Sequence, residues 1–306
     1  AMIMALGQHG RGTDALALFE DMRRMPLRAG EPKLEPNEVT LTAVLNACSH
    51  AGLVDEALAI HRTLASTAGG DALLTTRAQT CVVDALGRAG RLDDAEDFIA
   101  THIPQPDEVT WRTLLGACRL HGDVTRAERV AERLLRLAPG DASSRVLLGN
   151  VYAAVGRWED KTRVHQDMRE SGLRKSPGVS WIVVDGKRHV FVVEDKRHPR
   201  IKDIRAGLGV LWGQMKEAGF VPNTSKVLRP MDEAEAECHL CHHSEKLAIM
   251  FGLMSTPPGT TLRVFKNLRV CPDCHEATKF IARLTGREII VRDANRFHHF
   301  SGHKCS

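Results

Sequence analysis

The sequence predicts an α-solenoid of helical-hairpin repeats, followed by an α/β domain in which helices flank a mixed sheet. Two patterns predict this order. A glycine turn that opens an amphipathic helix recurs at intervals of roughly 35 residues in the N-terminal part of the chain. In the C-terminal part, short runs rich in β-branched and aromatic residues alternate with helical patterns, which favours a sheet covered by helices.

Size and composition set the outer limits. The chain has 306 residues, of which 43% are hydrophobic and 26% charged, so it can fold into two domains with their own cores. No apolar run is long enough to span a bilayer, and we predict no membrane partner. The net charge of +4 allows a nucleic-acid partner without requiring one. The first residues, AMIMALGQHG, lie within a helical pattern, so we interpret the sequence as a fragment of a longer protein.

Each repeat unit carries a glycine and, in most units, an alanine five residues later. Glycine permits the turn between two helices, and the small alanine lets the helices approach closely. A hairpin of this size cannot bury its faces alone, so consecutive hairpins stack. An irregular helical bundle is the alternative, and the regular interval argues against it. The glycines are Gly10, Gly52, Gly90, Gly122 and Gly156, and the alanines are Ala15, Ala57, Ala95 and Ala127, with Lys161 in the fifth unit.

Four segments of this region resemble one family. EPNEVTLTAVLNACSHAGLVDEAL and TCVVDALGRAGRLDDAEDFI resemble plant pentatricopeptide repeats of the long-and-short class, rather than tetratricopeptide repeats. VTWRTLLGACRLHGDVTRAERVAERLL and RVLLGNVYAAVGRWEDKTRVHQDMRESGLRKSPGVSW resemble the two extension motifs that follow such repeats. The resemblance implies a partial repeat at 1–38, a long repeat at 39–77, a short repeat at 78–108, and extension motifs at 109–143 and 144–175.

The resemblance also implies that each repeat reads about one base of single-stranded RNA. In this family the reading positions are the fifth residue of a repeat's first helix and the last residue of a repeat. Thr42 and Thr80 fall at the first position, and Asn37 and Asp107 at the second. The alternative is that these residues are ordinary helix caps, for which Asn, Asp and Thr are favoured. The extension motifs are expected to read bases less well.

A change of pattern predicts a domain boundary near residue 175. After it, VSWIVVDGKRHVFVVED predicts a β-hairpin that turns at Asp185-Gly186. Helical and strand patterns then alternate, which predicts the mixed sheet. The helical patterns cover 201–220, 244–255 and 274–286, and the strand patterns cover 260–268 and 287–293.

Two short motifs in the C-terminal part carry metal-binding residues. His243 and Glu245 form His-x-Glu at the predicted start of a helix, and Cys271 and Cys274 form Cys-x-x-Cys at another. One imidazole and two thiolates are a common zinc ligand set that leaves a fourth position for water. The positive end of a helix favours the thiolate form. The pair of motifs is the signature of zinc deaminases, although Val270 stands where that signature has proline.

The residues around these motifs resemble the DYW deaminase domain of plant organelle RNA-editing factors. The resemblance is carried by KSPGVSW, HSEKLAIMFGL and KNLRVCPDCHEATKFIARLTGREIIVRDANRFHHF, covers 176–306, and implies a cytidine-deaminase-like fold. It implies that His243, Cys271 and Cys274 hold a catalytic zinc and that Glu245 is the general acid and base. A purely structural zinc site is the alternative, and it leaves Glu245 without a role.

The resemblance implies a second, structural zinc held by His275, His298 and Cys305. The family continues beyond this point with another cysteine and an acidic-aromatic tail, whereas this sequence stops at KCS. We therefore expect the domain to lack its final residues and one ligand, which water or His303 would replace if the site is completed at all. Otherwise His299 and His303 are expected in a solvated polar end.

Other candidates have plainer interpretations. Cys238 and Cys241 have ligand-like spacing in an acidic segment, and we interpret them as free thiols rather than a third metal site. Trp181, Phe191 and Phe220 are interpreted as core residues rather than base-stacking platforms. The basic segment KRHVFVVEDKRHPR suits either an RNA channel or a solvated edge strand.

Together these features predict site-specific conversion of cytidine to uridine in RNA by zinc-dependent hydrolysis. By resemblance the expected partners are single-stranded RNA and other editing-factor proteins, in a mitochondrion or chloroplast, with no small-molecule cofactor. The alternative is an RNA-binding cofactor whose deaminase domain is inactive or recruits a catalytic partner. A metal-dependent endonuclease is disfavoured, because the sequence offers no second carboxylate cluster.

Overall fold

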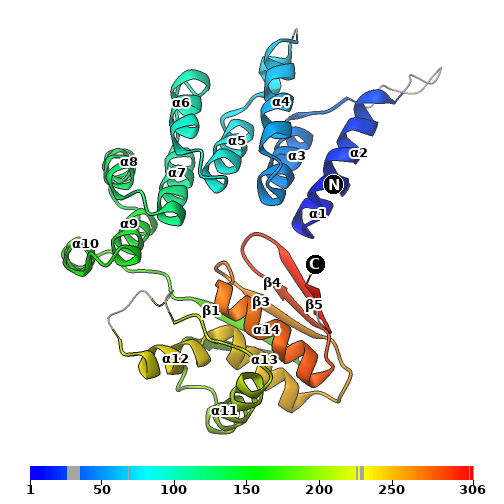
Figure 1. The fold of residues 1–306 in the computed structure, drawn as a ribbon, viewed down its shortest axis with the longest axis vertical. Helices are drawn as coiled ribbons and strands as arrows, with labels where there is room; N and C mark the ends of the chain where they lie inside the picture. Colours follow the sequence, from blue (N-terminus) through cyan, green and yellow to red (C-terminus); the bar gives the residue numbers. More distant parts are fainter. Residues whose placement is uncertain (26–34, 68, 225–226, 228–230, 303, 306) are drawn as a thin grey trace. The chain divides into compact units, whose positions relative to one another are not determined.

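The structure is a computed structural model that describes residues 1–25, 35–67, 69–224, 227, 231–302 and 304–305. The chain forms two compact units, Ala1–Lys175 and Ser176–Ser306 (Figure 1). The first is built from helical hairpins and the second from a mixed sheet with helices, so the predicted fold class is confirmed. Among the residues in these ranges, no helix has the length and the apolar surface needed to cross a membrane.

Helical hairpins stack side by side in the first unit, which we call the solenoid (Figure 1). Its helices are α1 (Met2–Gln8), α2 (Gly12–Arg24), α3 (Glu38–Ala51), α4 (Val54–Ala65), the 3₁₀ helix η1 (Gly70–Leu73), α5 (Thr76–Arg88), α6 (Leu92–His102), α7 (Glu108–His121), α8 (Val124–Leu137), α9 (Ala142–Ala154) and α10 (Trp158–Glu170). The first helix of each hairpin packs on the first helix of the next, from α1 through α3, α5 and α7 to α9. One apolar core therefore runs along the stack.

The repeated glycine and alanine positions explain this packing. All five turn glycines have φ between +71° and +79°, a left-handed conformation that only glycine adopts without strain. The four repeated alanines are completely buried, whereas Lys161 in the fifth unit is half-buried. Gly12 shows how close the helices lie, because a Cβ atom there would sit 2.4 Å from Ala51 Cβ.

The second unit is organised around a six-stranded sheet. Its strands are β1 (Val179–Val184), β2 (Lys187–Val192), β3 (Leu262–Lys266), β4 (Ile289–Arg292), β5 (Phe297–Ser301) and β6 (Lys304–Cys305). They lie in the order β2-β1-β3-β4-β5-β6, in which β3 and β4 are parallel and the other neighbours antiparallel. The basic segment after the hairpin turn thus begins with an edge strand. Asp185 and Gly186 both have positive φ, as a two-residue hairpin turn requires.

Helices cover one side of the sheet. They are α11 (Ile201–Glu217), α12 (Glu233–Cys241), α13 (Ser244–Ser255) and α14 (Pro272–Thr285). α13 packs on β1, β2 and β3, and α14 packs on β5 (Figure 1). Side chains alternate along each strand, so Ile182, Val264 and Val291 enter the core beneath these helices. We call this helix-covered side the inner face and the opposite side the outer face.

Candidate active site

Two helix starts converge on the inner face. His243 is the residue immediately before α13, Cys271 is the residue immediately before α14, and Cys274 lies in the first turn of α14. His243 Nδ1 lies 3.6 Å from Cys271 Sγ and 3.3 Å from Cys274 Sγ. All three ligand atoms lie within 4.8 Å of one another. The structure therefore brings together the three residues predicted as ligands of a catalytic zinc.

The donor set fits a zinc ion. Zinc bonds of roughly 2.0–2.1 Å to nitrogen and 2.3 Å to sulfur place these atoms roughly 3.5 Å apart in a tetrahedral site, and the two observed N–S distances fall on either side of that value. The pKa of Cys271 is raised by its hydrogen bond with Cys274 and by burial. A divalent cation bound to both sulfurs would offset the repulsion between two thiolate charges. The positive N-terminal end of α14 also favours the thiolate form.

A buried cation, Lys246, lies beside Cys274. Lys246 Nζ lies 2.7 Å from Asp273 Oδ2 and 3.4 Å from Cys274 Sγ, and it donates a hydrogen bond to Leu240 O at 3.0 Å. Burial lowers the pKa of Lys246, but Cys274 and Asp273 raise it above its usual value. The ammonium group therefore remains charged and offsets negative charge beside the thiol pair.

Glu245 lies in the first turn of α13 and is only 1% exposed. Its Oε2 lies 2.8 Å from Lys266 Nζ and accepts a hydrogen bond from Ser244 Oγ at 3.2 Å. Burial raises the pKa of Glu245, but Lys266 and His243 lower it, and the result is below the usual value. Glu245 is therefore an ionised carboxylate that strand β3 holds in place, close enough to His243 to feel its charge.

A second histidine cluster joins α14 to β5. The rings of His275 and His298 lie 5.3 Å apart, and His298 Nε2 donates to Asp293 Oδ2 at 3.0 Å. The same oxygen accepts the backbone N–H of Val270 at 3.1 Å, so Asp293 connects the cluster to the residue before Cys271. Burial raises the pKa of Asp293, but hydrogen bonds from His298 and from backbone N–H groups lower it well below its usual range.

Cys305, the third residue predicted for this cluster, lies in β6 with its Cα opposite that of Phe300. Its side chain lies outside the described part of the chain, as does the whole of His303. The structure thus brings His275 and His298 together and fixes only the backbone position of Cys305.

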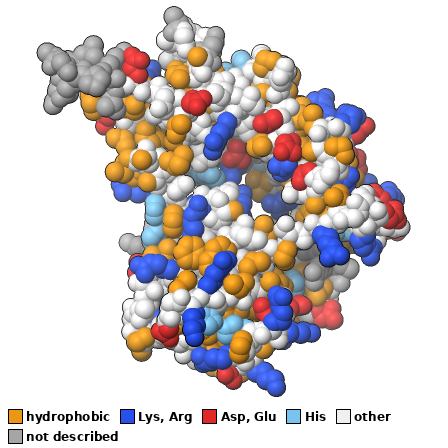
Figure 2. All heavy atoms as spheres, turned by 180° about the vertical axis from the view of Figure 1, so that it is seen from behind, with side chains coloured by type: hydrophobic (Ala, Val, Ile, Leu, Met, Phe, Trp, Pro, Cys, Tyr) orange, Lys and Arg blue, Asp and Glu red, His pale blue; other side chains and the backbone are white. Residues whose placement is uncertain are grey.

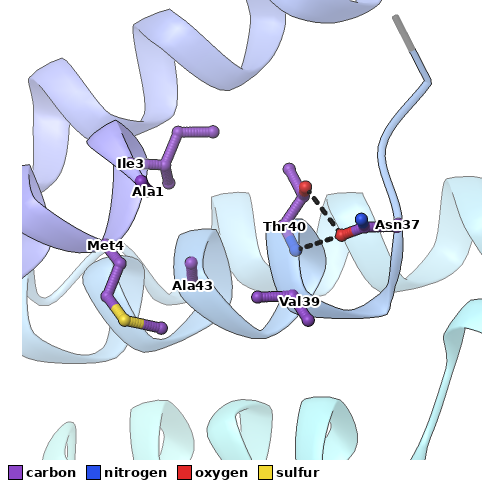
Figure 3. Close-up of a pocket in the computed structure, with 7 residues that line it drawn as sticks. All are labelled: Ala1, Ile3, Met4, Asn37, Val39, Thr40 and Ala43. Atoms are coloured by element: carbon purple, nitrogen blue, oxygen red, sulfur yellow. Dashed lines mark hydrogen bonds between the residues drawn. The ribbon is translucent and has the colours of Figure 1, made fainter.

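In the solenoid, two of the predicted base-reading residues cap helices. Asn37 Oδ1 accepts the backbone N–H of Thr40 at 2.9 Å and its hydroxyl at 3.0 Å (Figure 3). Asp107 Oδ1 accepts the corresponding groups of Thr110, both at 2.8 Å. Asn37 also lines a hollow of about 290 Å³ between α1 and the start of α3 (Figure 3).

The other two predicted reading residues lie within first helices. Thr42 is half-buried in α3. Thr80 is buried in α5, where its hydroxyl donates to Thr76 O at 2.7 Å and pairs with the Thr110 hydroxyl at 2.8 Å. Thr110 therefore links the cap formed by Asp107 to Thr80 in the neighbouring hairpin.

The remaining sequence candidates separate into core and surface. Cys238 and Cys241 have free thiols, and Cys238 is exposed whereas Cys241 belongs to the core. Phe191 and Phe220 are core residues, as predicted. The prediction for Trp181 was wrong, because this residue points to the outer face of β1, where it is half-exposed.

Sequence reasoning missed three charged residues around the site: Lys246, Lys266 and Asp273. A lysine directly after His-x-Glu on an otherwise apolar helix was one available signal, and an aspartate inside Cys-x-x-Cys was another. Buried charges need partners, so each of these residues should have been expected to pair with another.

Three family profiles match successive parts of the chain. The profile of the DYW family of nucleic acid deaminases matches residues 219–306, the profile of the E motif matches 121–183, and the profile of the PPR repeat matches 1–27 and 39–64. Among solved structures, the crystal structure of the pentatricopeptide repeat protein PPR10 from maize aligns with 93% of this chain and 41% of that one. The TM-score is 0.41 and the identity 19%.

Several relatives match the chain over its full length, among them three plant proteins. It is 45% identical to the pentatricopeptide repeat-containing protein At2g22070 of Arabidopsis thaliana. It is 44% identical to OGR1, mitochondrial, of Oryza sativa subsp. japonica, and 42% identical to ELI1, chloroplastic, of Arabidopsis thaliana. These alignments cover 38%, 50% and 47% of the respective relatives, so the chain spans half of their length or less.

Proposed function

Because the chain belongs to the pentatricopeptide repeat proteins that carry an E motif and a DYW-family deaminase domain, we propose that it converts cytidine to uridine in single-stranded RNA. The repeats hold the transcript. The second unit, Ser176–Ser306, which we call the deaminase unit, replaces the amino group of one cytosine by oxygen from water, releasing ammonia. One observation carries the proposal. His243, Cys271 and Cys274 converge at two helix starts, with the ionised Glu245 in the same turn as His243.

The residues of the site divide the work of this reaction. His243, Cys271 and Cys274 would hold a zinc ion, which would supply an activated water for attack at C4 of the base. Glu245 takes a proton from the water and delivers it to the departing ammonia. Lys266 orients this carboxylate and keeps it ionised until it takes up the proton.

A side chain of the protein offsets the negative charge of the proposed zinc ligands. Lys246 lies beside Cys274 and offsets the charge of the thiolates, while Asp273 holds Lys246 in position. We assign His275, His298 and Cys305 to a second, structural zinc, for which Asp293 would orient the His298 ring.

The solenoid supplies RNA selection in this proposal. Thr42 and Thr80 in first helices, together with Asn37 and Asp107 at helix starts, are the proposed base readers. The hydroxyl of Thr80 pairs with Thr110, so a base that contacts Thr80 must replace that bond. Relatives with mitochondrial and chloroplastic names support an organelle as the site of action, with organelle transcripts and other editing-factor proteins as partners.

The test is to express the chain in a host that lacks RNA editing, measure zinc per chain and sequence the cellular RNA deeply. Sites converted from cytidine to uridine should appear with the wild type. Glu245→Gln should reduce conversion roughly 10²- to 10⁴-fold without loss of zinc. Glu217→Gln, an exposed glutamate at the end of α11, is the matched control and should convert RNA as the wild type does.

The second candidate function is an RNA-binding cofactor whose deaminase unit does not react. The ion pair between Glu245 and Lys266 favours it, because a carboxylate fixed by a lysine must release that contact before it can deliver a proton. Bound zinc and bound RNA, without conversion in the wild type, would support this function and contradict the catalytic one.

A further inference from the structure

The outer face of the sheet carries a continuous row of side chains across five strands. Val190 of β2 pairs with Trp181 of β1, and Trp181 pairs with Phe265 of β3. Phe265 pairs with Arg292 of β4, and Arg292 pairs with Phe297 of β5. Directly opposite residues on neighbouring strands point to the same side of a sheet. The row therefore places three aromatic rings on the side away from α13 and α14.

The aromatic rings of this row are accompanied by arginines. Trp181 and Phe265 stack with their ring centroids 5.5 Å apart and an angle of 10° between their planes. The guanidinium carbon of Arg188 lies 4.4 Å from the centroid of the Trp181 ring, and that of Arg292 lies 4.9 Å from the centroid of Phe297. Trp181 and Phe265 remain half-exposed, so solvent reaches the stacked pair.

The charged side chains that strands β1 to β5 place on the outer face are all positive. Arg188 and Arg263 are exposed and Arg292 is half-exposed, whereas the strands β1 to β5 contain no aspartate or glutamate. The lysine of β3, Lys266, points to the inner face and pairs with Glu245. In Figure 2, seen from the side opposite to Figure 1, hydrophobic side chains lie among Lys and Arg side chains on this unit.

We propose that the outer face is a second binding surface for single-stranded RNA, distinct from the active site on the inner face. Bases would stack on Trp181 and Phe265, and Arg188, Arg263 and Arg292 would contact phosphates. A base stacked on Trp181 would displace the guanidinium of Arg188, which then meets the backbone beside that base. This inference rests on the proposed function, because it takes single-stranded RNA as the substrate.

The dimensions and the charge favour RNA over a protein partner. Trp181 and Phe297 are three strand intervals apart, or roughly 14 Å, which is room for the two or three bases that a four-stranded sheet stacks in RNA-recognition motifs. A protein that covered the rings would also have to neutralise the arginines, since the strands supply no carboxylate. An RNA strand supplies an aromatic surface and a phosphate at every residue.

The experiment uses the full chain with Glu245→Gln, so that RNA is bound and not converted, and a labelled oligouridylate as the probe. Trp181→Leu should weaken binding roughly 5- to 100-fold and remove most of the tryptophan fluorescence quenching caused by RNA. Trp181→Phe should keep most of the affinity. Arg263→Gln should lower the slope of log affinity against log salt by roughly 0.7, the loss of one phosphate contact.

Two variants serve as matched controls. Trp158→Leu removes a half-exposed tryptophan that also lies near a cation, Lys161 at 5.2 Å from its ring, and it should leave the quenching unchanged. Lys202→Gln removes an exposed cation from α11 and should leave the salt slope unchanged. Zinc content and melting temperature show whether each variant is folded.

Unchanged RNA affinity and unchanged quenching in folded Trp181→Leu would overturn the inference. A variant whose sedimentation profile changes while its RNA binding does not would also overturn it, because that result indicates that the outer face docks a protein. The proposed function is tested separately by conversion with Glu245 intact. Conversion without any effect of Trp181 on binding refutes only this inference. RNA-dependent quenching of Trp181 without conversion refutes only the proposed catalysis.

Discussion

Two helices of the solenoid and the two helices of the candidate active site begin in different ways. In the solenoid, α3 and α7 follow Asn37 and Asp107, whose side-chain oxygens accept hydrogen bonds from the first turn. In the deaminase unit, the ring of His243 makes no such bond at the start of α13. At the start of α14, Cys271 Sγ accepts the N–H of Cys274 at 3.3 Å and also lies 3.6 Å from His243 Nδ1. The same local feature thus stabilises a helix in the solenoid and presents candidate metal ligands in the deaminase unit.

The units also differ in where they place charge. Among the described residues of the solenoid, ion pairs are at least partly exposed, as between Arg91 and Asp94. The deaminase unit buries Lys246 with Asp273, and Lys266 with Glu245. Buried ion pairs contribute little net stability, because desolvation offsets their attraction. Their presence around the site therefore indicates that they hold functional groups in place.

Replacing the residue before α13 by a helix-capping residue should have the largest effect on RNA conversion. His243→Asn gives α13 a better cap, worth about 1 kcal/mol, but it removes the imidazole that we propose as a zinc ligand. We expect zinc at this site to be lost and conversion to fall by more than about 100-fold, since even outer partners of zinc ligands contribute 10- to 100-fold. Metal analysis and RNA sequencing measure both, and conversion close to that of the wild type would contradict the assignment.

Removing the buried cation should have the next largest effect. Lys246→Met leaves Asp273 buried without its partner, and we expect a loss of about 3–5 kcal/mol in the free energy of unfolding, measured in urea. Lys279→Met is the control, because Lys279 pairs with Glu276 at the surface and should change stability by less than about 1 kcal/mol. Equal losses in the two variants would show that burial of the Lys246 pair has no special weight.

The solenoid should respond to pH through Asp141, which caps α9. Burial raises its pKa, but hydrogen bonds from Ser144 and Ser143 and the charge of Arg112 lower it from 3.8 to about 2. A depressed pKa stabilises the folded state above pH 4 and loses this effect as pH falls toward 2. We expect a loss of about 2 kcal/mol across that range, seen as a fall in melting temperature. Asp141→Asn should flatten the pH dependence, and an unchanged profile would contradict the shift.

The smallest effect should separate capping from base reading at Asn37. Asn37→Ser keeps a capping oxygen, so stability should change by less than about 0.5 kcal/mol, whereas Asn37→Ala should lose about 1 kcal/mol. A base reader loses its preference in both variants. We therefore expect weaker discrimination among RNAs that differ at one position, measured by competition binding. Full discrimination by Asn37→Ser would leave Asn37 as a cap alone.

The repeat fold was predictable because its requirements are local. A left-handed turn needs glycine, and a close helix contact needs a small residue. A glycine followed five residues later by an alanine, as at Gly52 and Ala57, therefore predicts a hairpin in each repeat. The alternation of helix and strand patterns likewise predicted a mixed sheet. The spacing of Cys271 and Cys274 indicated metal for the same reason, since two ligands on one helix turn are a local pattern.

What the sequence did not predict depends on contacts between distant segments. Lys266 reaches Glu245 only because β3 lies beneath α13, and Asp293 reaches Val270 only because β4 ends beside the loop before α14. The prediction that Trp181 is a core residue failed for a related reason. Alternation along β1 shows that its two sides differ, but it does not show which side the helices cover.

A single oxygen of Asp293 receives both the ring of His298 and the backbone of Val270. A displacement of Asp293 would break both hydrogen bonds. A substitution in the histidine cluster that moves Asp293 should therefore also move the loop that carries Cys271. We therefore expect related proteins that have lost His275 or His298 to have lost Cys271 or Cys274 as well. Comparing substitutions at the two pairs of positions across related sequences would test this.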